Sequence, residues 1–233
     1  MPYSIDEIVK AYEILVKGIE AEANDSEDRA FGGIIRAGKG KLVESIARHM
    51  IEIAWQNIKG EPERLSFVKQ IYKIPIKKSY IEKLKYAEVR EYIYKNIKNY
   101  YYGFRTDIHV SIDNKMVMGI ECKAYTENAM LKRILVDFTL LKSVVPNIIC
   151  VLLQLESQLT GDYGKPKNNI IFGSYSSHTI MSYFDIDLNI ITLLEGERRV
   201  KEPIHNSMHY KELKKDSLEM GIASISELLK KYL

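Results

Sequence analysis

A nearly unbroken apolar run, NIICVLLQL at residues 147–155, is the feature that most constrains the fold of this chain. Strands with one solvated face alternate polar and apolar residues, so a continuous run indicates a strand buried on both faces of a sheet. Apolar residues at helical spacing precede it over residues 127–143, and an alternating stretch, TDIHVSIDNKMVMGIECKAY at 106–125, precedes that helix. Strand, helix and buried strand in this order predict a βαβ unit and an α/β fold.

Other periodic segments surround this unit. Apolar spacing predicts helices at about 5–23, 41–58 and 80–99, and from about Tyr210 to the end of the chain. Residues 65–76 are expected to be extended, and IIFGSYSS (170–177) and LNIITLLE (188–195) are two further strand candidates. Thr126 is expected to cap the 127–143 helix. Since no repeat or linker divides the chain, we predict one domain over residues 1–233.

The composition is that of a soluble globular protein, with 46% hydrophobic and 28% charged residues. The longest apolar run is far shorter than the ~20 residues of a spanning helix, so no membrane association is expected. The acidic, amphipathic N-terminus lacks the pattern of a signal peptide. Both cysteines, Cys122 and Cys150, lie in apolar strand-like segments, where we expect buried reduced thiols and hence a cytoplasmic location.

Charge is distributed unevenly along the chain, although its net value is only +3. Residues 1–30 hold eight acidic and three basic residues, whereas residues 59–105 hold twelve basic and five acidic residues. The basic segment also carries eight of the sixteen tyrosines. Basic residues interleaved with aromatic ones suit a nucleic-acid backbone. A solvated lysine-rich surface would have the same composition, so this segment alone leaves both interpretations open.

The segment GIIRAGKG, residues 33–40, satisfies the first seven positions of the P-loop pattern. Gly40 stands where the pattern needs the Ser or Thr that binds Mg²⁺, and an acidic segment precedes it instead of a buried strand. We therefore do not predict nucleotide binding. The free N–H groups of a helix beginning there could still meet a DNA phosphate. The expected DNA-backbone contacts are Arg36, Lys39, Lys41, Lys69, Lys73, Lys77, Lys78 and Arg105.

The alternating stretch predicts a β-hairpin with two chemically different faces. Its even-numbered residues from Ile108 to Cys122 are apolar outside the loop, and its odd-numbered residues include Asp107, Glu121 and Lys123. The apolar residues share one face if the loop has three residues, 113–115. That register places Asp107 opposite Glu121, with Cβ atoms within about 5.5 Å. A two-residue loop would slip the register and send the acids to opposite faces.

Two carboxylates this close repel one another unless a cation lies between them. Mg²⁺ prefers one or two carboxylates together with waters and substrate phosphate. Lys123 shares the face of Glu121, where it could hold or deprotonate an attacking water. A bound metal could polarise a phosphoryl oxygen, with the ammonium group of Lys123 beside it. The two carboxylates and the lysine therefore predict a site for phosphodiester hydrolysis.

The same stretch resembles the PD-(D/E)xK nuclease superfamily, in which an acid begins one strand and Glu-x-Lys ends the neighbouring strand. Asp107, Glu121 and Lys123 match this motif, whereas Thr106 stands in place of its proline. The resemblance implies a restriction-endonuclease-like three-layer core, a central mixed β-sheet flanked by helices, over about residues 41–156. The N-terminal helix and the C-terminal strands and helix would be additions to this core.

The resemblance also implies further metal ligands. The main-chain carbonyl of Cys122 matches the usual extra ligand, and an acid often comes from a helix before the hairpin. Glu44 is the best-placed candidate for that acid, and Glu52 lies two turns along the same side. His109 shares the site face and could touch DNA, although a histidine in a strand is more often structural.

The resemblance implies an Mg²⁺-dependent type II restriction endodeoxyribonuclease that cuts a specific site in double-stranded DNA. A homodimer is expected, because two-fold symmetry lets two subunits cut both strands of a palindrome. Two alternatives remain: a structure-specific repair or recombination nuclease of the same fold, or an inactive DNA-binding module. A third interpretation is that Glu121 and Lys123 are merely an exposed pair on an amphipathic hairpin, without a catalytic role.

Overall fold

Five strands form the central sheet in the order β1-β4-β5-β6-β7. The computed structural model describes residues 4–24, 29–159, 173–199, 201–202 and 209–233. β1 pairs antiparallel with β4, as β4 does with β5, whereas β5, β6 and β7 run parallel, so the sheet is mixed. The strands are β1 (Leu65–Ser66), β4 (Ile108–Ile112), β5 (Lys115–Thr126), β6 (Ile149–Ser157) and β7 (Leu188–Thr192).

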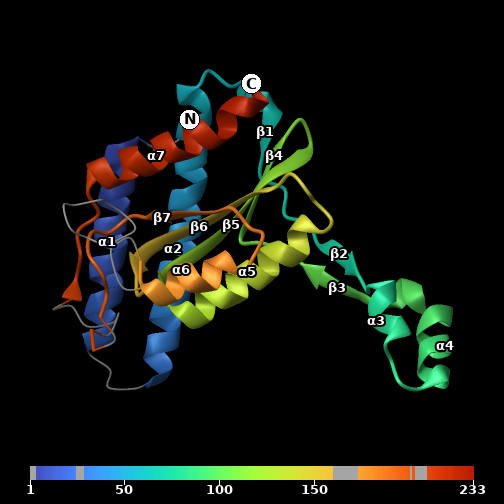
Figure 1. The fold of residues 1–233 in the computed structure, drawn as a ribbon. Coiled ribbons are helices and arrows are strands. Elements are labelled where there is room, and N and C mark those ends of the chain that lie inside the picture. The colour runs from blue at the N-terminus through green and yellow to red at the C-terminus, as the bar shows by residue number, and fades with distance from the viewer. Residues whose placement is uncertain (1–3, 25–28, 160–172, 200, 203–208) are drawn as a thin grey trace.

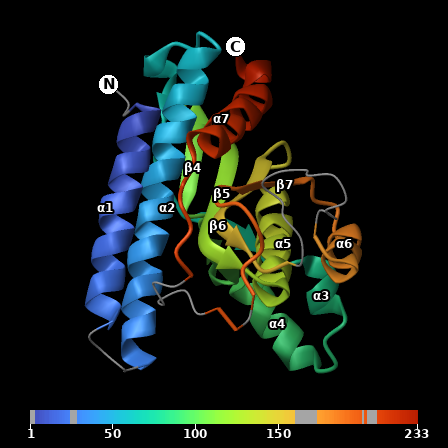
Figure 2. The same ribbon diagram turned by 90° about the vertical axis from the view of Figure 1, so that its left-hand side faces the viewer.

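Helices cover both faces of this sheet (Figures 1 and 2). On one face lie α1 (Ile5–Asn24), α2 (Arg29–Asn57) and α7 (Lys215–Leu229), and their apolar residues share a core with the even-numbered residues of β4 and β5. On the other face lie α5 (Asn128–Lys142) and α6 (Tyr175–Ser182). The strand β6 is buried along its whole length, as its apolar run predicts. The predicted three-layer α/β core is confirmed, with β5-α5-β6 as its βαβ unit.

The hairpin between β4 and β5 differs from the prediction in its loop. Only Asp113 and Asn114 form the turn, and both have positive φ angles, of 51° and 62°. Ile112 pairs with Lys115 and not with Met116, so the predicted three-residue loop is wrong. A β-bulge compensates, because β5 contains one extra residue, Val117, between the partners of Val110 and Ser111.

The bulge restores the register that the site needs. Beyond it Ile108 pairs with Ile120, so even-numbered residues again face even-numbered ones. The expectation that a two-residue turn would separate the acids was therefore wrong. Met116, on the turn side of the bulge, packs with the α5 core instead of the even-numbered face.

Several helical predictions need correction. α2 begins twelve residues before the predicted start at Lys41, so GIIRAGKG lies inside a helix and provides neither a P-loop nor a helix N-terminus. The predicted 80–99 helix is divided into α3 (Lys78–Glu82), α4 (Ala87–Lys95) and a 3-10 turn (Ile97–Asn99). Two further 3-10 turns are Pro62–Arg64 and Lys230–Tyr232.

Two local predictions after β5 are also wrong. Glu127, not Thr126, is the N-cap residue of α5, and the Thr126 hydroxyl is buried without a hydrogen-bond partner. The strand expected at 170–177 is not formed in its described part, where Ser174 caps α6 by accepting from the Ser177 N–H. Residues 170–172 lie outside the described residues. Both cysteines are free and buried, as expected.

A projecting lobe lies in the chain just before β4. It consists of a two-stranded ribbon, β2 (Tyr72–Pro75) and β3 (Tyr101–Phe104), which carries α3 and α4 away from the body (Figure 1). We call residues 72–104 the arm. Its root is fixed by Ile74 and Phe104, which pack into the α5 core, whereas only Ile81 and Ile93 are buried within α3 and α4.

Candidate active site

The hairpin brings the three predicted site residues together. Asp107 directly precedes β4, and Glu121 and Lys123 lie on β5. The backbone N–H of Cys122 donates to Asp107 Oδ2 at 2.8 Å, which ties the first acid to the strand that carries the second. Thr106 Oγ1 donates to the Ile108 carbonyl at 2.8 Å and fixes the turn into β4. The register and these bonds together place both carboxylates on one face of the sheet.

Lys123 lies between the two carboxylates. Its Nζ is 2.9 Å from Asp107 Oδ2 and 2.7 Å from Glu121 Oε2. Burial lowers the pKa of Lys123, but the charges of Glu121 and Asp107 outweigh burial and raise that pKa overall. Lys123 therefore stays protonated at neutral pH. A protonated ammonium group can hold a water or a phosphate, whereas it cannot deprotonate a water.

Glu121 is the more buried of the two acids. Its side chain is 10% exposed, against 31% for Asp107. Burial raises the pKa of Glu121, Lys123 opposes this shift and Asp107 adds to it, with a net value of about 7. A carboxyl group with such a pKa binds a proton or a cation readily near neutral pH.

The oxygen atoms around Lys123 fit a hard divalent cation. Two carboxylates from adjacent strands already converge on one positive charge, and oxygen donors of this kind suit Mg²⁺. The carbonyl group of Cys122 belongs to the same strand segment, whereas its thiol packs into the core on the opposite face. Among the residues that the structure describes, no three His, Cys, Asp or Glu side chains form a metal-binding group.

Glu44, the helix acid expected from the resemblance, is engaged elsewhere. Its Oε2 is 3.1 Å from the Nζ of Lys69. The pKa of the Cys122 thiol is raised mainly by burial and next by the charge of Asp107, with Lys123 opposing the rise. The charge of Glu44 makes a smaller contribution to the same rise. Glu44 therefore lies near the site without joining the two carboxylates in one ligand cluster. Glu52 pairs with His49 at 3.3 Å, on the same helix.

Two polar residues beside the site did not emerge from the sequence. Asp137 on α5 adds to the rise in the pKa of Glu121. Burial raises the pKa of Asp137 itself, and the charges of Arg133 and Lys123 oppose that rise. Gln154 on β6 is the strand partner of Lys123 and is fully buried. Its Nε2 donates to Thr192 Oγ1 at 3.0 Å, and its Oε1 has no hydrogen-bond partner. A glutamine inside the apolar run 147–155 was the signal that could have identified it.

Comparison with known proteins determines the family. No family model matches the chain. The type II restriction enzyme DdeI of Desulfomicrobium norvegicum is 49% identical over 227 residues, which cover 95% of this chain and 94% of that protein. The chain belongs to the type II restriction enzymes. It is thus a site-specific endodeoxyribonuclease, and the predicted enzyme class is confirmed.

A solved structure, the native BbvCI A2B2 tetramer at low resolution, was also found. Its sequence is 12% identical to this chain, and the aligned region covers 98% of this chain and 89% of that chain, with a TM-score of 0.39. A similarity of this size supports no conclusion. Within the described ranges, this restriction enzyme has no helix long and apolar enough to cross a membrane.

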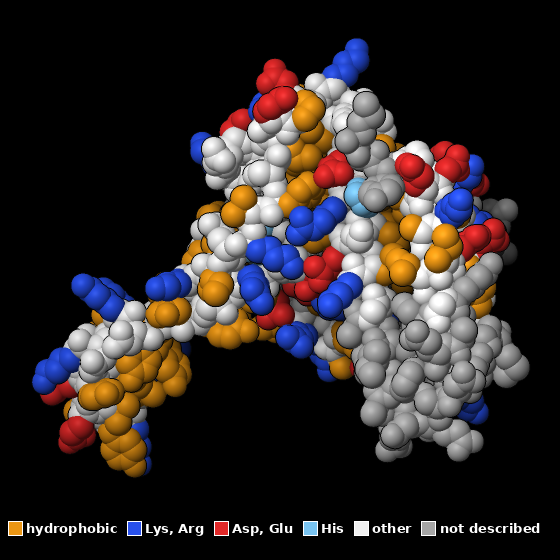
Figure 3. Space-filling view, turned by 180° about the vertical axis from the view of Figure 1, so that it is seen from behind, with side chains coloured by type: hydrophobic (Ala, Val, Ile, Leu, Met, Phe, Trp, Pro, Cys, Tyr) orange, Lys and Arg blue, Asp and Glu red, His pale blue; other side chains and the backbone are white. Residues whose placement is uncertain are grey.

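Many basic side chains of this restriction enzyme gather on one face of the molecule. Figure 3 shows Lys and Arg side chains around an acidic cluster in the hollow between the arm and the body. Lys73 lies over the Tyr101 ring, with Nζ 4.5 Å from its centre. Lys77, Lys78 and Arg105 are exposed, and Lys69 holds Glu44. These positions are compatible with the expected DNA contacts.

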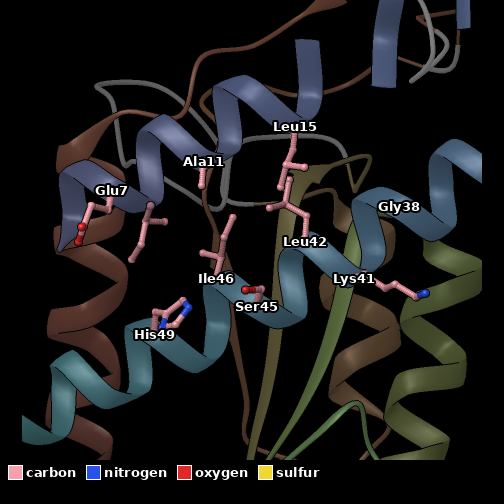
Figure 4. Close-up of a pocket in the computed structure, with 10 residues that line it drawn as sticks. Glu7, Ala11, Leu15, Gly38, Lys41, Leu42, Ser45, Ile46 and His49 are labelled. Atoms are coloured by element: carbon pink, nitrogen blue, oxygen red, sulfur yellow. The ribbon is translucent and has the colours of Figure 1, made fainter. Parts of the chain in front are cut away.

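The predicted DNA contacts on α2 are less accessible or lie beside a different groove. Lys39 is 4% exposed, which argues against a DNA contact there. Lys41 is exposed but lines a groove between α1 and α2, and Arg36 falls in the same helix. This groove has a volume of about 420 Å³ and is lined mainly by apolar residues such as Ile8, Leu15 and Ile46 (Figure 4). Neither Asp107 nor Glu121 lines it, so the groove is separate from the site.

His109 is buried in the restriction enzyme, with both ring nitrogens near backbone N–H groups. It is 1% exposed, which argues against the expected DNA contact. Its Nδ1 is 3.2 Å from the Gln70 backbone nitrogen, and its Nε2 is 3.2 Å from that of Thr106. Burial, with smaller effects of Lys69 and Arg105, lowers its pKa, so the ring is neutral near pH 7. A neutral ring accepts at one nitrogen only, so one of these two N–H groups donates to it. Either bond ties a residue that flanks the arm, Gln70 or Thr106, to His109 of β4.

Proposed function

We propose that this chain is a PD-(D/E)xK nuclease that hydrolyses double-stranded DNA with Mg²⁺. One observation carries the proposal: Lys123 joins two carboxylates that come from adjacent strands in the order of that motif. An exposed Glu-Lys pair of no catalytic meaning would not also recruit Asp107 from a neighbouring strand. The buried position of Glu121 likewise favours a site over surface decoration.

In the mechanism that we propose, each group has a distinct task. Asp107, Glu121 and the carbonyl of Cys122 would hold the cation against the scissile phosphate. When bound, Mg²⁺ would polarise the phosphate and lower the pKa of a coordinated water. Lys123 would orient the attacking water and offset the growing negative charge through its ammonium group. As the water oxygen bonds to phosphorus, the P–O3′ bond would break and the 3′-oxygen would leave. Glu44 would act indirectly, by holding Lys69 beside the site.

The DNA-backbone contacts that we retain are Lys69, Lys73, Lys77, Lys78 and Arg105. All five side chains are exposed and belong to the basic segment, residues 59–105, that lies just before Asp107 in the chain. Arg36 and Lys41 remain weaker candidates, because a helix interior lacks the free N–H groups expected there. We further infer a homodimer, and a cytoplasmic location consistent with two free buried thiols.

A digest of sequenced phage DNA tests the proposal. With Mg²⁺, we expect discrete fragments whose ends share one sequence. Lys123→Ala should lower the cleavage rate by about 10²-fold or more, because it removes charge stabilisation from the transition state. Lys115→Ala, which changes an exposed lysine of the same hairpin, is the matched control and should cut normally. An unchanged rate for Lys123→Ala would refute the catalytic assignment.

The digest also separates the alternative nuclease. A structure-specific repair enzyme would cut branched DNA and leave linear phage DNA without a fixed fragment pattern. Membership of the type II restriction enzymes, shown by 49% identity, decides against this alternative, so the discrete pattern is the expected result.

A further inference from the structure

We propose that the arm, residues 72–104, is a DNA-binding element that grips the duplex beside the scissile phosphate. This inference rests on the proposed function and extends its DNA contacts from the lysines at the root of the arm to the outer part, α3 and α4. It concerns affinity for the substrate and not the chemical step.

The arm is rooted directly at the active site. Its last strand, β3, ends at Phe104, and only Arg105 and Thr106 separate it from Asp107. Its first strand, β2, begins just after Gln70, whose backbone nitrogen contacts the His109 ring on the catalytic strand. A duplex whose phosphate reaches Asp107 therefore passes the root of the arm.

The attachment of the arm is firm. Four consecutive pairs join β2 to β3, from Tyr72 with Phe104 to Pro75 with Tyr101. Ile74 and Phe104 pack with Phe138 and Leu141 of α5, in the core on the same face of the sheet as Glu121. A ribbon anchored in this way holds α3 and α4 at a fixed place relative to the catalytic acids, as a recognition element requires.

The arm concentrates positive charge. It holds eight basic and three acidic residues, whereas the whole chain has a net charge of only +3. Its outer lysines, Lys83, Lys85, Lys95 and Lys98, are all exposed. Figure 3 shows basic side chains along one edge of the projecting arm. Phosphate groups, one per about 1.7 Å of duplex, are the complementary partner for such an edge.

Aromatic side chains accompany this charge. The exposed tyrosines of the arm are Tyr80, Tyr86, Tyr92, Tyr94, Tyr101 and Tyr102. Lys73 lies over Tyr101, and Lys85 lies over Tyr86 at 5.6 Å from the ring centre. Tyrosine hydroxyls and lysines both donate to phosphate oxygens in protein–DNA interfaces.

A second copy of the chain is the main competing occupant. Tyrosine is also frequent in protein interfaces, but lysine is depleted there. An arm whose exposed lysines alternate with its tyrosines therefore fits a nucleic-acid backbone better. The continuity of the arm with the catalytic strand favours the same partner, because a phosphate must reach Asp107 for cleavage.

Two lysines of the arm allow a clean test. Lys85→Gln/Lys98→Gln removes two exposed charges, and Lys10→Gln/Lys231→Gln removes two from α1 and the C-terminal turn as a matched control. Binding of a duplex carrying the cleavage site is measured by fluorescence anisotropy without divalent metal, at several salt concentrations. We expect the arm variant to bind roughly tenfold or more weakly, with a salt slope shallower by about 2. Its single-turnover cleavage rate at saturating enzyme should equal that of the unmodified protein.

Three results would overturn the inference in different ways. A wild-type affinity and salt slope in the arm variant would show that the arm does not touch DNA, even though the enzyme still cuts. A lower molecular mass in solution with an unchanged salt slope would assign the arm to a second copy of the chain. If the unmodified protein neither bound nor cut duplex DNA, the proposed function itself would fail.

Discussion

Glu121 and Asp107 form a pair with unequal environments. Glu121 is the more buried acid, and its pKa is raised to about 7 chiefly by burial, with Lys123 opposing and Asp107 adding to the shift. A protonated carboxyl group is a poor ligand for a cation. Below pH 7 the proton and the metal therefore compete for Glu121, and above pH 7 they do not.

This competition gives a pH prediction. The Mg²⁺ concentration for half-maximal cleavage should be nearly constant above pH 7 and rise about tenfold per unit below it. Cleavage rates measured across Mg²⁺ titrations from pH 5.5 to 8.5 check this. Glu121→Gln should lose this pH dependence together with most of its activity, whereas Glu63→Gln, at an exposed site, should keep both. Equal Mg²⁺ requirements at pH 6 and pH 8 would contradict the assignment.

At the residue scale, sequence could predict what the backbone period determines. Asp107, Glu121 and Lys123 were identifiable because alternation along two strands fixes their face. Asp137 and Gln154 were not, because their places near Lys123 depend on how α5 and β6 pack. The burial of His109 was equally hidden, since its ring contacts Gln70, a residue distant in the sequence.

The β4-β5 hairpin shows how an element can reach a predicted register by another route. Alternation required equal parity across the strands, and a three-residue loop was one solution. A two-residue turn followed by a bulge at Val117 is another, with the same pairing at the site. The apolar Val117 fits either arrangement, so the sequence pattern did not distinguish them.

The turn itself is testable, because Asn114 has a φ of 62°. Asn114→Gly should leave stability unchanged or slightly higher, since glycine adopts this conformation without steric cost. Asn114→Val should lower the free energy of unfolding by about 1–2 kcal/mol, because a β-branched residue is strained there. Thermal unfolding measures both, with Lys115→Val in the adjoining strand as control. Equal stabilities of the Gly and Val variants would favour a different loop.

The arm illustrates a limit at the same scale. Helical spacing over 80–99 indicated one helix, but the chain forms α3, α4 and a 3-10 turn. Arg90 stabilises the break between the helices by donating to the Leu84 carbonyl at 2.5 Å. Such a contact leaves no trace in hydrophobic periodicity. The outward projection of the arm likewise follows from the β2-β3 ribbon, which only pairing reveals.

At the scale of the whole molecule, one chain supplies one set of the proposed catalytic groups. Asp107, Glu121 and Lys123 come from a single hairpin, so cutting both strands needs two chains or two successive events. We expect a two-fold symmetric dimer of twice 26.9 kDa, with one site facing each strand. Light scattering coupled to size-exclusion chromatography measures this mass.

Mixed dimers test whether the two sites work together. Unmodified protein should convert supercoiled plasmid to linear DNA, and Lys123→Ala homodimers should leave it intact. Subunits exchanged between the two should form dimers with one working site, and these should nick the plasmid to open circles. Open circles should accumulate in proportion to the mixed fraction, because each site cuts the strand that it faces. If mixing only diluted the linear product, each chain would act alone and the two-fold arrangement would be refuted.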